Sequence, residues 1–248
     1  MEKNAFTAAL QTNCFGRYLE VFDTLPSTNT YLKEHIALPH GAVVLAANQT
    51  AGRGRRGRTF FSPAGGLYMS VLIHRRLTAQ TVGLLTSAAA VATAQAIEAL
   101  CPVSVGIKWV NDLLINNKKV CGILAEGAPA DGWAVIGVGI NVNTPVFPQE
   151  LGTIATSLYK ESGNTVSAER LAATVLNMLE PLVDTVENAA FLEEARRRSV
   201  VIGKEITVLR GNETFTARAV GIDDTGGLII EKDGNTAVLT SGEVSVRL

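Results

Sequence analysis

The pattern of apolar residues changes near Arg196–Val200, and this change constrains the fold more than any other feature. Before it, β-branched and alternating runs typical of strands are mixed with longer runs at helical spacing. After it, only short alternating runs remain, separated by turn-forming clusters at residues 223–227 and 233–235. We therefore predict an α+β domain over residues 1–197 and a small β-barrel over residues 198–248.

The elements of the larger domain follow from its runs. Strands are expected at residues 19–23, 42–47, 67–73, 104–110, 112–115, 118–126 and 133–139. Asn116-Asn117 predicts a tight hairpin because Asn tolerates the left-handed backbone that such a turn requires. Helices are expected at residues 28–36, 79–100 and 167–186. The barrel strands are expected at residues 205–209, 213–221, 227–231, 236–240 and 243–247.

The most apolar stretch, residues 82–100, is interrupted by polar side chains: Thr86, Ser87, Thr93, Gln95 and Glu98. It therefore predicts a buried helix and no membrane span. The N-terminus has no apolar core of signal-peptide length. Cys14, Cys101 and Cys121 are widely separated and form no CxxC pair. A cytoplasmic location is the simplest expectation for such cysteine usage.

The segment Gly52–Arg58 alternates four arginines with three glycines. It satisfies the G-x-G-x-x-G pattern, but no regular helix can begin in the residues that follow, and no acidic residue occurs between Glu34 and Glu98. A dinucleotide fold needs both features, so that interpretation fails. Glycines and forked arginine donors instead suit the binding of a carboxylate or phosphate, and the segment is expected to be mobile until an anion orders it. The alternatives are a solvated basic loop or a nucleic-acid contact, against which the formal net charge of -1 argues.

Polar residues also gather in the segment Lys108–Asp112, between apolar runs. Asp112 is a candidate for binding an amine, a ribose or a magnesium-bound phosphate, and Lys119 for neutralising a carboxylate or phosphate. A purely structural Lys–Asp ion pair is the alternative. In Gly137–Asn143, two glycines allow a ligand close to a strand end, or simply ease the end of the strand.

Taken in order, these segments resemble the biotin protein ligase family. The resemblance rests on residues 27–29, Gln49 with 52–58, 108–112, 119–126, 137–141 and 242–247. It implies a class II synthetase-like mixed sheet flanked by helices, plus a small C-terminal SH3-like β-barrel. It also implies that ATP, with Mg²⁺ held mainly through its phosphates, activates biotin to biotinyl-5'-AMP. The biotin is then transferred to a lysine of a biotin carboxyl carrier protein.

The resemblance implies a role for individual residues. Catalytic roles fall to Lys119, Arg55 and Asp112. Biotin binding falls to Ser27, Thr28, Asn29, Gln49, Gly52, Arg53, Lys119 and Gly122. Nucleotide and phosphate binding falls to Arg55, Arg56, Arg58, Asn111, Asp112, Asn141 and Arg247. Glu243 and Arg247 resemble barrel residues that reach toward the site, and no protein side chain is expected to act as a dedicated metal ligand.

The sequence departs from the family in two places. Val110 stands where the family usually has proline, which should change backbone stiffness more than chemistry. Fewer than thirty residues precede Ser27, too few for the DNA-binding domain of some members, so a ligase without repressor function is expected.

Three other functions remain open: a lipoate or octanoate ligase, a nucleic-acid-binding module that uses the arginine segment, and a biotin-binding protein without catalysis. The arginine string and the terminal barrel favour the biotin ligase. A homodimer formed through a sheet edge is a further hypothesis, although nothing in the sequence locates an interface.

Overall fold

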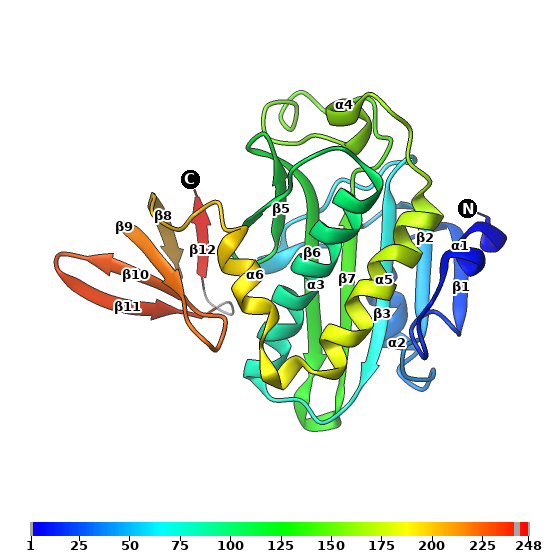
Figure 1. Ribbon diagram of the computed structural model, residues 1–248, viewed down its shortest axis with the longest axis horizontal. Helices are drawn as coiled ribbons and strands as arrows, with labels where there is room; N and C mark the ends of the chain where they lie inside the picture. The colour runs from blue at the N-terminus through cyan, green and yellow to red at the C-terminus, as the bar shows by residue number, and fades with distance from the viewer. Residues whose placement is uncertain (1, 241–243, 248) are drawn as a thin grey trace.

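The computed structural model describes residues 2–240 and 244–247. Its larger part contains a seven-stranded sheet in the order β1-β2-β3-β7-β6-β5-β4 (Figure 1). The strands are β1 Leu19–Leu25, β2 Val43–Gln49, β3 Leu67–His74, β4 Gly106–Lys108, β5 Asp112–Ile115, β6 Lys118–Ala128 and β7 Trp133–Ile140. β1 and β2 run parallel, and the other neighbours are antiparallel. All seven predicted strands are therefore confirmed.

The turns between these strands follow from local chemistry. Asn116 and Asn117 both have positive φ, 50° and 63°, and they form the predicted hairpin between β5 and β6. β4 is shorter than predicted. Residues 109–111 leave the strand for the turn into β5, so the expected strand at 104–110 keeps only its middle.

Helices cover both faces of this sheet (Figure 1). The long helices α3 Ala79–Leu100 and α5 Ala168–Asp184 pack on one face, and α2 Thr28–Glu34 packs on the other against β2, β3 and β7. Serine or threonine caps each of these three helices at its N-terminus, through Thr78, Ser167 and Ser27 respectively. Three short helices were not predicted: α1 Lys3–Ala9, α4 Leu158–Ser162 and α6 Phe191–Arg197.

Alternation along the strands divides the core between the two faces. Val43 and Leu45 contribute to the large core under α3 and α5, whereas Ala42 and Val44 belong to a smaller core under α2. Among the described residues, α3 is long and apolar enough to cross a membrane by length and composition. However, 72% of its most apolar window is buried inside the protein. The prediction of a buried core helix is therefore confirmed.

The C-terminal part is a five-stranded antiparallel sheet in the order β11-β10-β9-β8-β12. Its strands are β8 Glu205–Arg210, β9 Glu213–Ile222, β10 Leu228–Lys232, β11 Asn235–Leu239 and β12 Val244–Arg247. They match the five predicted strands within the part of the chain that the structure describes, which leaves out Glu243.

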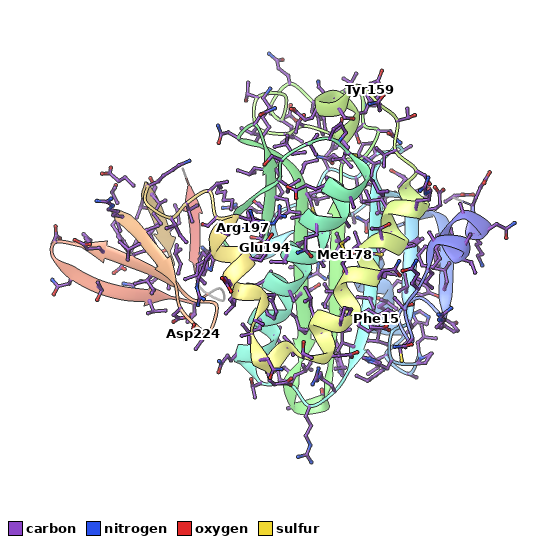
Figure 2. The ribbon with its side chains drawn as sticks, viewed as in Figure 1. Phe15, Tyr159, Met178, Glu194, Arg197 and Asp224 are labelled. Carbon is purple, nitrogen blue, oxygen red and sulfur yellow. The ribbon has the colours of Figure 1, made fainter. Side chains whose placement is uncertain are left out.

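Side chains of the larger part hold the small sheet in place. Trp109 Nε1 donates to the carbonyl of Gly226 at 3.0 Å, and Arg196 Nε donates to the carbonyl of Ile222 at 2.7 Å. Arg196 also pairs with Asp224 at 2.7 Å, and Figure 2 labels this aspartate on the small sheet. The small sheet is thus fixed both to α6 and to the polar segment that contains Trp109.

Candidate active site

The register of the sheet places the site on the face that α2 covers. Tyr68 pairs with Gly139, Gly139 with Gly122, and Gly122 with Asp112, so these residues form one row across four strands. Directly paired residues point to the same face of a sheet. The row therefore joins the middle of the sheet to the polar segment before β5, with two glycines as its floor.

A small pocket lies over this glycine floor. It is lined by Ser27, Thr28, Asn29, Gln49, Arg53, Phe60, Tyr68, Met69, Gly122, Leu124, Gly137, Val138 and Gly139. Its free volume is about 30 Å³, which is close to one water molecule's share of liquid volume. A Cβ atom on Gly139 would lie 2.7 Å from the Phe60 ring, and one on Gly122 would lie 3.0 Å from it. A larger ligand must therefore displace a lining side chain, and Phe60 lies in the irregular segment after the arginines.

Hydrogen bonds connect the polar residues at one end of the pocket. The backbone N–H and Oγ1 of Thr28 lie 2.9 and 3.2 Å from Gln49 Oε1, and Gln49 Nε2 donates to Ser62 at 3.0 Å. Ser70 Oγ lies 2.7 Å from Thr28 Oγ1 and 2.6 Å from Asn29 Oδ1. This end therefore offers both donors and acceptors to a ligand with the same mixture.

The arginine segment borders the pocket. Arg53 pairs with Glu126 at 3.1 Å, Arg55 donates to Asn111 Oδ1 at 3.2 Å, and Arg56 donates to the carbonyl of Leu209 at 3.2 Å. No regular helix follows Gly57, as predicted, since residues 58–63 are irregular. Burial lowers the pKa of the Arg55 guanidinium from its ordinary value. An arginine held partly out of water gains free energy when it pairs with an anion.

Lys119 lines a second, cationic cleft of about 110 Å³, which adjoins the pocket and shares Arg53, Phe60, Gly122 and Leu124 with it. The cleft is lined by Arg53, Gly54, Arg55, Arg56, Arg58, Thr59, Phe60, Lys108, Trp109, Asn111, Asp112, Lys119, Gly122, Ile123 and Leu124. Lys119 Nζ is 2.7 Å from Asp112 Oδ1 and 5.4 Å from the centroid of the Phe60 ring. The Lys–Asp ion pair considered from the sequence is thus present, and it lies inside the cleft.

The structure brings most of the predicted site residues together, with three exceptions. Gly52 lines neither the pocket nor the cleft, and a Cβ on it would lie 2.4 Å from both the carbonyl oxygen of Phe60 and Ser62 Oγ. Asn141 is only 4% exposed, donates to the carbonyl of Thr156 at 2.9 Å and lines neither the pocket nor the cleft. Its position after the end of β7 takes it toward the loop before α4 instead. The backbone of Arg247 belongs to β12, while its side chain and all of Glu243 lie outside the described residues.

Sequence reasoning missed three residues at this site. Ser70 and Phe60 line or support the pocket, and Glu126 binds Arg53. The arginine segment has no acidic residue near it in the sequence, but the fold places Glu126 beside Arg53. Alternation along β6 from Gly122 through Leu124 to Glu126 is the signal that could have placed this glutamate on the pocket face.

Comparison with known proteins agrees with this geometry. Residues 21–143 match the biotin/lipoate A/B protein ligase family, and residues 201–247 match the biotin protein ligase C-terminal domain. The chain is 34% identical over 239 residues to the biotin–acetyl-CoA-carboxylase ligase of Mycobacterium tuberculosis, covering 92% of this chain and 88% of that relative. The chain belongs to the biotin protein ligase family.

Other members of the biotin protein ligase family match over most of their length. The bifunctional ligase/repressor BirA of Bacillus subtilis is 34% identical over 248 residues, which cover 96% of this chain and 76% of that relative. Among solved structures, the biotin protein ligase of Aquifex aeolicus in complex with biotin and ATP superposes with a TM-score of 0.83 at 29% identity. That match covers 93% of this chain and 99% of the other, so it includes both sheets.

Proposed function

We propose that this protein is a biotin protein ligase. It activates biotin with ATP to biotinyl-5'-AMP and transfers the biotin to a lysine of a biotin carboxyl carrier protein. The observation that carries this proposal is the junction between the polar pocket and the cationic cleft, which share Arg53, Phe60 and Gly122 beside Lys119. A ligand in the pocket can place an anionic end directly among the cations of the cleft.

The polar end of the pocket favours biotin over lipoate or octanoate. A ureido ring has two N–H donors and one carbonyl acceptor, which suit the groups of Thr28, Asn29 and Gln49. These groups bond to one another and to their neighbours in the structure. A dithiolane ring or an alkyl chain could not replace any hydrogen bond that its entry breaks, and a polar group left unpaired costs binding free energy. Ser27, at the N-cap of α2, lines the same end.

In the first step a carboxylate oxygen of biotin attacks the α-phosphorus of ATP, and pyrophosphate leaves. Two anions must meet, so the cations Lys119, Arg55, Arg56 and Arg58 offset their repulsion. Mg²⁺, when bound, neutralises phosphate charge. It would be held mainly by those phosphates, with oxygen ligands available from Asn111 and Asp112.

In the second step the neutral amine of the carrier lysine attacks the acyl carbon, and AMP leaves. Asp112 is the carboxylate in the cleft that could orient this amine. It is paired with Lys119 in the structure, so it would have to release Lys119 when the substrate anions arrive. Closure of the arginine segment would protect the mixed anhydride from water.

The proposal also covers the domain organisation, the cellular location and the oligomeric state. We propose that residues 1–197 form the class II synthetase-like catalytic domain and residues 198–248 the SH3-like barrel, supported by the separate seven- and five-stranded sheets. The cysteines among the described residues are free, as a reducing cytoplasm would keep them. The homodimer stays a hypothesis, and a single monomer mass in light scattering with biotin and ATP would contradict it.

The nucleic-acid alternative fits the site less well. Arg53 and Arg55 are directed toward Glu126 and Asn111 around the cleft, and the chain carries a formal net charge of -1. We therefore propose that the protein acts without binding DNA. Tight, strongly salt-dependent binding to a generic duplex would contradict this part of the proposal.

Transfer to a carrier domain tests the function directly. The purified protein is incubated with biotin, ATP, Mg²⁺ and the biotin-accepting domain of acetyl-CoA carboxylase, and the mass of the carrier is followed. The proposal predicts the mass increase of one biotinyl group, which requires ATP and is lost when the acceptor lysine is replaced by arginine. An unchanged carrier mass in the complete reaction would contradict it.

A further inference from the structure

One carboxylate connects α2 to the base of the arginine segment. Glu126 Oε2 accepts a hydrogen bond from Asn29 Nδ2 at 3.1 Å. Its other oxygen, Oε1, lies 3.0 Å from Lys33 Nζ and 3.1 Å from Arg53 Nη2. Asn29 and Lys33 are one helical turn apart, so they present their side chains on the same side of α2. Three partners from two segments therefore meet at this glutamate.

The ion pair with Glu126 orients the Arg53 side chain, which is too exposed for packing to fix it. The Arg53 side chain is 45% exposed, although it lines both the pocket and the cleft. Among the side chains that the structure describes, Glu126 is the one that binds its guanidinium. An exposed arginine without such a partner would sample many rotamers, and ordering it on ligand binding would cost conformational entropy.

The contact with Asn29 fixes the orientation of an amide inside the pocket. An ionised carboxylate only accepts hydrogen bonds, so the NH₂ group of Asn29 must face Glu126, and it also donates to the carbonyl of Leu124 at 3.1 Å. The amide oxygen is thereby turned toward Ser70, 2.6 Å away. A Cβ on Gly137 would lie 2.0 Å from this oxygen, so the amide fills the space that the glycine leaves.

The carboxylate is tolerated beside an anion site because cations flank it. Burial opposes ionisation, but hydrogen bonds from Lys33 and Asn29 and the charges of Lys33 and Arg53 outweigh it and hold the pKa of Glu126 below its ordinary value. Glu126 is therefore charged at neutral pH. The three charged groups together carry a formal charge of +1, which still attracts a carboxylate.

We propose that Glu126 is a positioning residue for biotin, which acts by preorganising Arg53 at the rim of the pocket and the amide of Asn29 within it. This inference rests on the proposed function. Simple electrostatics makes the opposite prediction, since removing a negative charge near an anion site would tighten the binding of biotin. The sign of the effect therefore separates positioning from net charge.

The test is a double-mutant cycle on biotin affinity, measured by titration calorimetry with E126Q, R53M and the double variant. We expect E126Q to weaken biotin binding roughly tenfold, the scale of one hydrogen bond to a charged group. The double variant should lose less affinity than the two single losses combined, because part of the effect of Glu126 runs through Arg53 and only the part through Asn29 remains in R53M. Biotin affinity in E126Q equal to or tighter than that of the parent, or full additivity in the double variant, would overturn the proposal.

Three further variants complete the experiment. E187Q removes the charge of a glutamate that pairs with Arg75 at 3.0 Å elsewhere, and it should leave biotin affinity unchanged. K33M removes a cation from Glu126 while Arg53 keeps its partner, so its effect should stay below about threefold, and a loss equal to that of E126Q would overturn the proposal. E126D keeps the charge but withdraws it from Arg53, so it should weaken binding even if E126Q does not fold. Parental affinity in E126D would also overturn it.

Biotin binding by the parent protein distinguishes a failure of this inference from a failure of the proposed function. If the parent binds no biotin, the proposed function fails. If the parent binds biotin and E126Q binds it equally well, only the role of Glu126 fails.

Discussion

Lys119 Nζ lies 2.7 Å from Asp112 Oδ1, in the cationic cleft that adjoins the polar pocket. The pair is partly exposed, with 32% and 24% of the two side chains accessible, so water competes for both ions. Such a pair is easily exchanged for a substrate anion. Lys119 can therefore move from Asp112 to a carboxylate or phosphate without leaving a buried charge unpaired.

Replacing Lys119 by alanine should abolish most of the adenylation activity. The cation would no longer offset the repulsion between carboxylate and α-phosphate, and we expect kcat to fall roughly 100-fold or more. K118A is the matched control, because this neighbouring lysine begins β6 beside the hairpin and lines neither pocket nor cleft. Steady-state formation of AMP in the presence of biotin measures both variants, and similar losses in the two would contradict the role of Lys119.

Gly137→Ala should damage the pocket. Its Cβ would lie 2.0 Å from Asn29 Oδ1, so the amide must move and break its contacts with Ser70 and Glu126. We expect a loss of about 1–3 kcal/mol in biotin binding, the usual scale of overpacking. G221A is the control, since a Cβ on that strand glycine meets its nearest atom at 3.5 Å. Equal biotin affinity in G137A and the parent would show that the amide does not need its present position.

Arg198 should contribute to stability in a pH-dependent way. It is only 9% exposed and binds both oxygens of Glu98 at 2.7 Å, joining α6 to α3. Its loss in R198M should cost about 3 kcal/mol in the free energy of unfolding, measured with urea. R210M is the control, because Arg210 and Glu213 form an exposed pair that should contribute less than about 1 kcal/mol.

The ion pairs of Arg198 also predict how the stability of the fold changes at acidic pH. The hydrogen bond from Arg198 holds the pKa of Glu98 below its ordinary value, and Arg197 and Arg198 lower that of Glu194 to about 2. Carboxyls with depressed folded pKa values stabilise the fold above their unfolded pKa of about 4.3, and this stability is lost as pH falls through the folded pKa. R198M should therefore show a shallower loss of stability between about pH 4.5 and 2. A slope equal to that of the parent would contradict this account.

Glu180→Gln should release the N-terminal segment. The Glu180 carboxylate is 6% exposed and accepts the backbone N–H groups of Asn13, Cys14 and Phe15 at 2.6, 2.6 and 2.8 Å. An amide would direct its own NH₂ group at one of these donors, so we expect a loss of about 2 kcal/mol. Hydrogen exchange over residues 3–17 should accelerate, whereas E169Q, at an exposed contact with Glu2, should not change it. Unchanged protection in E180Q would refute the role of this carboxylate.

The sequence predicted regular elements well and short ones poorly. α3 and α5 are long and capped. α3 is apolar around most of its surface and α5 is apolar on one side, so both could be recognised from the sequence. α1, α4 and α6 contain seven, five and seven residues, which is too short for a periodic pattern. They form because neighbours hold them, as when α1 packs against α5. α2 is equally short but follows a Ser/Thr cap region, which made it recognisable.

The parts of the candidate site that lie within one short segment of the chain could be predicted from the sequence. The glycine–arginine string and the Lys108–Asp112 segment indicated anion binding before any fold was known. Glu126 and Ser70 were missed because their importance arises from strand register, which brings β6 and β3 under α2. Asn141 lies away from the pocket and the cleft, because a polar residue at a strand end can bond to the adjoining loop.

Adenylation is measured most directly by the exchange of labelled pyrophosphate into ATP, with biotin and lipoate supplied separately. We expect exchange that depends on biotin and Mg²⁺, is absent with lipoate, and is lost in K119A but kept in K118A. No exchange with biotin, or exchange with lipoate alone, would contradict the proposed function.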